Sequence, residues 1–104
     1  MSTLNGNDEI LMLTILALGS NAYGATMMKH LTKISGKEWS IGAIYDPLYR
    51  LEKQGLISSE QTNPLPERGG RSKRLYKLTK AGEKALHEHQ RVRNELTDGL
   101  VDFA

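Results

Sequence analysis

The chain has 104 residues, enough for one domain, and 38% of them are hydrophobic, so a modest core can form. It contains no cysteine, which excludes disulfides and thiolate chemistry and fits a reducing cytoplasm. The net charge is only +2, but residues 50–80 hold eight Lys or Arg against three acids, and the segments on either side are net acidic. Such a concentration is typical of a nucleic-acid-binding surface, with a merely solvated surface as the alternative.

The sequence predicts neither a secretory leader nor a membrane span. The N-terminus lacks the charged, apolar and small-residue order of a signal peptide. The longest apolar stretch, residues 10–18, includes a threonine and is far shorter than the roughly 20 residues that cross a bilayer. We therefore expect a soluble, cytoplasmic protein without membrane contact.

The first helix is expected to begin at Asn7, an N-cap residue followed by Asp8 and Glu9, because acids are favourable in a first turn. Gly19 is expected to end it. The helix is apolar on almost every side, which predicts burial on more than one side and partial cover by a second chain.

A turn at residues 19–21 leads to a second helix over residues 23–35, which Gly36 ends. Its apolar positions follow a 3.6-residue period and comprise Met27, Met28, Leu31 and Ile34. The methionines, with Met12, suit core filling better than a ligand site. Trp39, in the link that follows, is expected to anchor the core, with stacking on an aromatic effector as the less favoured alternative.

A third helix is expected over residues 41–54, capped by Ser40 and stopped by Gly55. Its apolar face comprises Ile41, Ile44, Tyr45, Leu48 and Leu51. Its open face comprises Gly42, Ala43, Asp46, Tyr49, Arg50 and Lys53. Pro47 deletes a backbone hydrogen bond, so a bend or a tight first turn is expected there.

Strands are expected over residues 56–61 and 73–78, joined by a basic loop over residues 62–72 that contains two Pro and two Gly. A final helix, capped by Thr79, reaches about Val101. The predicted fold is mostly α with a small β-hairpin, a winged helix-turn-helix followed by a C-terminal dimerisation helix. It forms a single domain over residues 1–104, divided at about 8–79 and 80–104.

Two blocks of this sequence resemble the PadR family of transcriptional regulators. The motif SIGAIY at residues 40–45, continuing to RLE and GLI by residue 57, resembles that family's recognition helix. The motif ERGGRSKRLYKLT at residues 67–79, with Gly82 shortly after, resembles its wing and the start of its C-terminal helix. The resemblance covers roughly residues 8–86, and the short final helix resembles the compact members of the family. Asp46 departs from it, because many relatives have proline directly after the helix tyrosine. The order Tyr23-Gly24 departs too, where many relatives read Gly-Tyr.

The resemblance implies a two-fold dimer, built largely by the C-terminal helix with help from the first helix. It also implies repression of a nearby promoter. In several relatives a small aromatic or drug-like ligand releases the DNA, so the resemblance implies an effector of that class.

The third helix supplies most candidates for DNA contact. Basic side chains meet phosphates, and small residues at the helix start let its free N–H groups approach the backbone. Asp46 can accept a hydrogen bond from a cytosine amino group. Tyr45 is expected either to aim its hydroxyl at a phosphate or to be a simple core tyrosine. The candidates are Ser40, Gly42, Ala43, Tyr45, Asp46, Tyr49, Arg50 and Lys53.

The predicted wing supplies the other candidates, because arginine at a loop tip can enter a narrow minor groove and glycine allows close backbone approach. A solvated loop is the alternative. The candidates are Arg68, Gly69, Gly70, Arg71, Lys73 and Arg74, and Lys73 and Lys77 should face solvent or phosphate.

The final helix is too long for the domain to cover, and its apolar side predicts a symmetric partner. A two-fold dimer implies a palindromic operator with half-sites about one DNA turn apart or a multiple of that. The expected interface residues are Leu11, Ile15, Leu86, Val92, Leu96, Leu100 and Phe103.

No set of acid, base and nucleophile is evident, so we expect neither an enzyme nor a cofactor. His30, His87 and His89 lack the spacing of metal ligands, so no metal site is expected. The alternative function is a winged-helix protein-interaction module that does not bind DNA. The four cations around the predicted wing favour DNA binding over that alternative.

Overall fold

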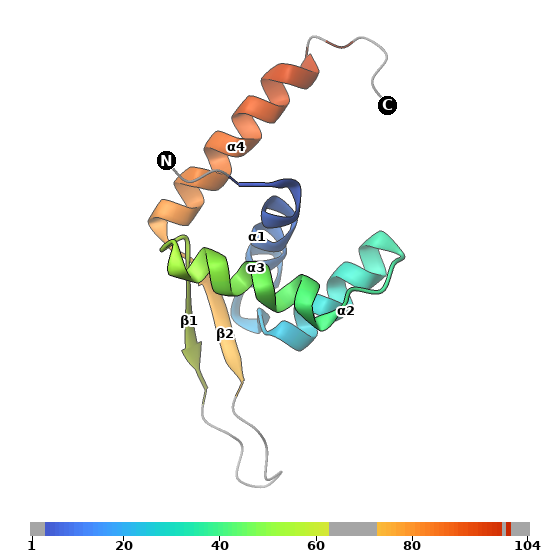
Figure 1. Cartoon of the computed structure of the whole chain (residues 1–104), viewed down its shortest axis with the longest axis vertical. Coiled ribbons are helices and arrows are strands. Elements are labelled where there is room, and N and C mark those ends of the chain that lie inside the picture. Colours follow the sequence, from blue (N-terminus) through green and yellow to red (C-terminus); the bar gives the residue numbers. More distant parts are fainter. Residues whose placement is uncertain (1–3, 63–72, 99, 101–104) are drawn as a thin grey trace, which may run out of the picture.

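The computed structural model describes residues 4–62, 73–98 and 100. Four α-helices and a two-stranded antiparallel sheet confirm the predicted fold class (Figure 1). In chain order the elements are α1 (Gly6–Leu18), the 3-10 turn η1 (Gly19–Asn21), α2 (Gly24–Ser35), α3 (Ile41–Lys53), β1 (Ile57–Gln61), β2 (Arg74–Leu78) and α4 (Lys80–Asp98).

The first helix begins two residues earlier than the sequence suggested, because Asn5 is its N-cap rather than Asn7. The Asp8 N–H donates to Asn5 Oδ1 at 2.8 Å, and the Asn5 N–H donates to Asp8 Oδ2 at 3.0 Å. This reciprocal pair satisfies two backbone donors at the helix start. Gly19 ends the helix with φ at +55°, as predicted.

The second and third helices confirm their predicted caps. Gly36 ends α2 in the left-handed conformation, and Ser40 Oγ accepts the Ala43 N–H at 3.1 Å at the start of α3. The α3 helix begins at Ile41, as predicted, and continues through Pro47. Met27, Leu31, Ile44, Leu48 and Leu51 are buried.

Three apolar side chains expected in the core are exposed instead. Ile34 lies in the last turn of α2, and Ile41 in the first turn of α3, where the neighbouring helices no longer cover them. Tyr45 is 42% exposed and lies at the rim of the core. Trp39 packs partly against the core, as predicted, and its Nε1 donates to Ser35 Oγ at 3.2 Å.

The hairpin is fixed to the helices by backbone hydrogen bonds. Its register pairs Ile57 with Leu78 and Gln61 with Arg74. The Tyr76 N–H donates to Ala22 O at 2.9 Å, in the segment between η1 and α2, so β2 is held on both edges. The strands extend from the helices at the end of the molecule opposite α4 (Figure 1).

The last helix begins where predicted, since Thr79 Oγ1 accepts the Gly82 N–H at 3.0 Å. Its first turns pack on the domain through Gly82 and Leu86, and the rest of the helix runs away from it (Figure 1). The described part of α4 ends at Asp98, three residues before the expected end. Among the residues that the structure describes, no helix is both long and apolar enough to cross a membrane.

Candidate nucleic-acid interface

The solvent-facing side of α3 carries most of the predicted DNA-contacting residues. Small residues lie at its start, and tyrosines and a lysine follow towards its end. The exposed candidates are Ser40, Gly42, Ala43, Tyr45, Asp46, Tyr49 and Lys53. The capped N-terminus of this helix leaves backbone N–H groups available to an anion.

A hollow of about 650 Å³ lies between α3 and β2. It brings together four residues predicted from the sequence, and the last of them comes from the hairpin: Tyr45, Tyr49, Lys53 and Arg74. Lys53 Nζ lies 5.3 Å from the centre of the Tyr49 ring. The hollow therefore places two cations from different elements beside exposed phenol rings.

Two further residues line this hollow that sequence reasoning missed, Glu52 and Tyr76. Glu52 is acidic and Tyr76 lies in a strand, so neither type suggested a phosphate contact. Burial is the main reason that the pKa of Tyr76 is raised above its ordinary value, with the neighbouring Tyr45 adding to it. Its phenol therefore stays protonated and can donate a hydrogen bond.

A chain of polar contacts holds Arg74 at the hollow. The Ser59 hydroxyl donates to Glu52 Oε2 at 2.6 Å, and Arg74 Nη1 donates to Ser59 Oγ at 2.9 Å. Glu52 belongs to α3, and the other two residues to the strands. The chain thus links the orientation of the hairpin arginine to the third helix.

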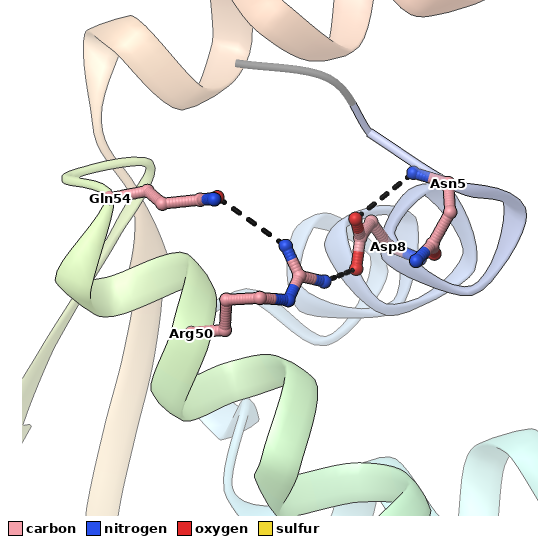
Figure 2. Close-up of polar contacts among 4 residues, drawn as sticks. All are labelled: Asn5, Asp8, Arg50 and Gln54. Carbon is pink, nitrogen blue, oxygen red and sulfur yellow. Dashed lines mark hydrogen bonds and ion pairs between the residues drawn. The ribbon is translucent and has the colours of Figure 1, made fainter.

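Arg50 does not lie where the sequence suggested. Its Nη2 donates to Asp8 Oδ1 of α1, and its Nη1 lies 3.4 Å from Gln54 Oε1 (Figure 2). The guanidinium thus faces α1 rather than the open face of α3, because the buried Asp8 carboxylate attracts it. The sequence pattern placed the Cα correctly, but a long side chain can reach around its helix.

The described cations of the hairpin are exposed, as predicted. Lys73 and Lys77 both face solvent, and Lys73 Nζ lies 5.3 Å from the centre of the Tyr23 ring. The predicted wing-tip residues Arg68, Gly69, Gly70 and Arg71 lie outside the described residues.

The second helix packs against the candidate interface at a glycine. A Cβ at Gly24 would lie 1.9 Å from Tyr45 Oη, so only glycine leaves room for the tyrosine ring there. This contact explains why the ring of Tyr45 lies over α2 with one edge open to solvent.

The expected interface residues fall into two groups. Leu11, Ile15 and Leu86 are buried in the core of the chain itself, so they offer no surface to a partner, which corrects the expectation for them. Val92 and Leu96 are exposed along α4, Leu96 to 71%, and Leu100 is exposed beyond the helix. Phe103 lies outside the described residues. The exposed apolar side chains of α1 are instead Ile10, Leu13 and Leu16, on the face opposite its core residues.

A groove of about 910 Å³ runs along the side of α4 that carries Val92 and Leu96. Apolar residues from three parts of the chain line it, among them Leu4, Leu56, Ala85, Val92 and Leu96. Arg91 bonds to Glu88, which also lines the groove, and to Glu95 of the same helix, and it holds the pKa of Glu88 below its usual range. The groove side of α4 thus carries its exposed apolar residues, with Glu88, His89 and Arg93 among the polar residues that line the same groove.

In the described parts of the chain, no three His, Cys, Asp or Glu side chains come together as metal ligands. Met12 and Met27 are fully buried in the core, as the sequence suggested.

Comparison with known proteins gives a consistent result. Residues 12–88 match the model of the transcriptional regulator PadR-like family. A transcriptional regulator of Mycobacterium tuberculosis is 38% identical over 80 residues, which cover 77% of this chain and 70% of that protein.

Two solved structures also resemble the chain at 28% identity. A PadR-like transcription factor from Bacteroides fragilis superposes with a TM-score of 0.71, covering 88% of this chain and 84% of its own. A PadR family regulator from Eggerthella lenta superposes with a TM-score of 0.65, covering 88% and 80%.

Proposed function

Since the chain belongs to the PadR-like family of transcriptional regulators and is thus a DNA-binding regulator rather than an enzyme, we propose that it is a repressor acting as a homodimer on a palindromic operator. In this proposal α3 enters the major groove, and the hairpin follows the adjacent backbone. A small aromatic ligand bound near the dimer interface would release the DNA.

The observation that carries the DNA-contact proposal is the hollow between α3 and β2. Lys53 of α3 and Arg74 of β2 both line it, together with Tyr76, whose neutral phenol can donate a hydrogen bond. A phosphate there would meet two cations and one or more hydroxyls, which is the donor set that anchors DNA-binding proteins to the backbone. Glu52 also lines the hollow, but the two cations outnumber its single negative charge, and its Oε2 accepts the Ser59 hydroxyl.

The homodimer proposal rests on α4. Its exposed apolar side chains recur at Val92 and Leu96, four residues apart, on one face of the helix beside the groove. A second copy of α4 would cover this face symmetrically, and two α3 helices would then face successive turns of DNA.

Replacing Lys53 by Gln should weaken DNA binding and reduce its salt dependence. Each dimer then loses two phosphate contacts, so the slope of log K against log salt should fall by roughly 2. Binding of DNA from upstream of the protein's own gene, measured by fluorescence anisotropy at several salt concentrations, checks this. Arg74→Gln should behave in the same way.

Arg91→Gln is the matched control, since Arg91 is an exposed cation of α4 whose partners lie on its own helix. It should keep both the affinity and the slope. If Lys53→Gln and Arg74→Gln match the wild type, the hollow does not bind phosphate. If the wild type binds no DNA at any salt concentration, a protein-interaction role replaces the repressor.

A further inference from the structure

The first turn of α1 holds two adjacent buried acids that point to different helices. Asp8 is fully buried, and its carboxylate accepts from Arg50 of α3 (Figure 2). Glu9 is 8% exposed and faces α4, where Arg93 Nη2 lies 3.2 Å from its Oε2 and His89 Nε2 lies 3.6 Å from its Oε1. One helical turn thus contacts both the recognition helix and the last helix.

Capping explains only part of this arrangement. Asp8 completes the cap with Asn5. The buried Oε2 of Glu9 accepts no hydrogen bond from the described residues, and its contact there is the ion pair with Arg93. A buried carboxylate is costly unless its partners are held in place. The position of Glu9 is therefore coupled to the position of α4.

The contacts of α4 show what Glu9 controls. Gly82 and Leu86 hold its first two turns against the domain, and Val92 and Leu96 beyond are open. His89 and Arg93 follow Leu86 along the helix, so their pairing with Glu9 is the last polar attachment of α4 to the domain among the described residues. Figure 1 shows that α4 runs away from the other helices, so a change in this attachment would change the direction in which it leaves the domain.

We propose that Asp8 and Glu9 form a joint that fixes the angle between α3 and α4, and thereby the separation of the two recognition helices in the dimer. Arg50, His89 and Arg93 are positioning residues in this joint, and Arg50 does not contact phosphate. The part of this inference that concerns the spacing of DNA half-sites rests on the proposed repressor function, whereas the joint itself can be measured without DNA.

The α4 helix is long enough for a small change in its angle to displace its far end appreciably. With 19 residues, α4 is about 28 Å long at 1.5 Å per residue. A tilt of about 10° about its first turn, which the pairing of Glu9 with His89 and Arg93 opposes, would move its far end by about 5 Å, which exceeds the 3.4 Å rise of one base pair. Loss of the Glu9 pairing should therefore alter which half-site spacing fits both protomers.

The absence of cysteine permits a direct test, because Lys29→Cys on the exposed side of α2 gives one spin-label site per protomer. Electron–electron distance measurement on the full-length dimer should give one narrow distribution between the two labels. Glu9→Gln and Arg93→Gln in that background should broaden it or shift its mean by several Å. Glu95→Gln and Arg91→Gln are matched controls, since both residues pair only within α4, and they should leave it unchanged.

Unchanged distributions in Glu9→Gln and Arg93→Gln, with the dimer intact by light scattering, would overturn the joint. Circular dichroism reports whether each variant folds. If Glu9→Gln does not fold, Arg93→Gln decides the question, because the Arg93 side chain is half exposed and does not belong to the buried core.

Selection from random duplex DNA tests the consequence for spacing. The wild type should enrich paired half-sites at one separation, and Glu9→Gln should enrich at least two separations. The same single separation in both would refute the role in spacing. If the wild type enriches no sequence, the DNA-binding proposal fails, and the label distances still decide on the joint.

Discussion

Replacing Leu96 by Glu is expected to convert the dimer into a monomer and to lower affinity for the operator by roughly two to four orders of magnitude. Leu96 is 71% exposed on the open side of α4 and lines its groove. In a two-fold interface each substitution is made twice, and a carboxylate buried without a partner is strongly unfavourable. A monomer also loses the advantage of holding two half-sites at once.

Light scattering gives the oligomeric state of Leu96→Glu, and fluorescence anisotropy gives its affinity for DNA. The matched control is Asn94→Glu, which adds the same charge to an exposed position of the same helix outside the groove. That variant should remain dimeric and bind DNA like the wild type. A dimeric Leu96→Glu variant with normal affinity would place the interface on another face.

Gly82→Ala is expected to destabilise the fold by roughly 2–3 kcal/mol, because overpacking against a fixed group costs about that much. A Cβ at this position would lie 1.8 Å from Leu56 O, a backbone atom that cannot rotate away. Leu56 O also accepts the Thr79 N–H at 3.1 Å, so a shift would strain the junction between the sheet and α4. The midpoint of thermal unfolding should fall by about 10–20 °C.

Thermal melts followed by circular dichroism at one fixed protein concentration measure this change, since dimerisation makes the midpoint depend on concentration. Gly6→Ala is the control. Nothing lies within 4 Å of a Cβ at Gly6, and alanine favours a helix over glycine. Gly6→Ala should match or slightly exceed the wild type. A Gly82→Ala variant as stable as Gly6→Ala would show that α4 can move away from the sheet at little cost.

The order and type of the elements could be predicted because each boundary has a local cause. Gly19, Gly36 and Ser40 end or begin helices through their own backbone or side-chain chemistry, and all three act as predicted. The start of α1 was misplaced because Asn5 and Asn7 are equally good caps in isolation. The choice between them depends on Asp8, which forms the reciprocal bond only with a residue three positions earlier.

The candidate site was predicted less completely. Periodicity identified Tyr49 and Lys53, because it reports which residues share a helix face, whereas Tyr45, on the predicted apolar face, was a candidate through its hydroxyl. It could not show that Arg50 reaches Asp8, 42 positions away in the chain, since that pairing depends on how α1 packs on α3. The same limit applies to Tyr76, which enters the hollow only because the register of the hairpin places it there.

The hydrogen bonds along the hairpin have a consequence for the position of Arg74. Thr62 and Lys73 close the described ladder with three hydrogen bonds, and the Ala22 carbonyl holds β2 from its other edge. The position of Arg74 is therefore set by these hydrogen bonds and not by the segment that joins the strands. We therefore expect Arg74 to keep its place if residues are inserted into or removed from that segment.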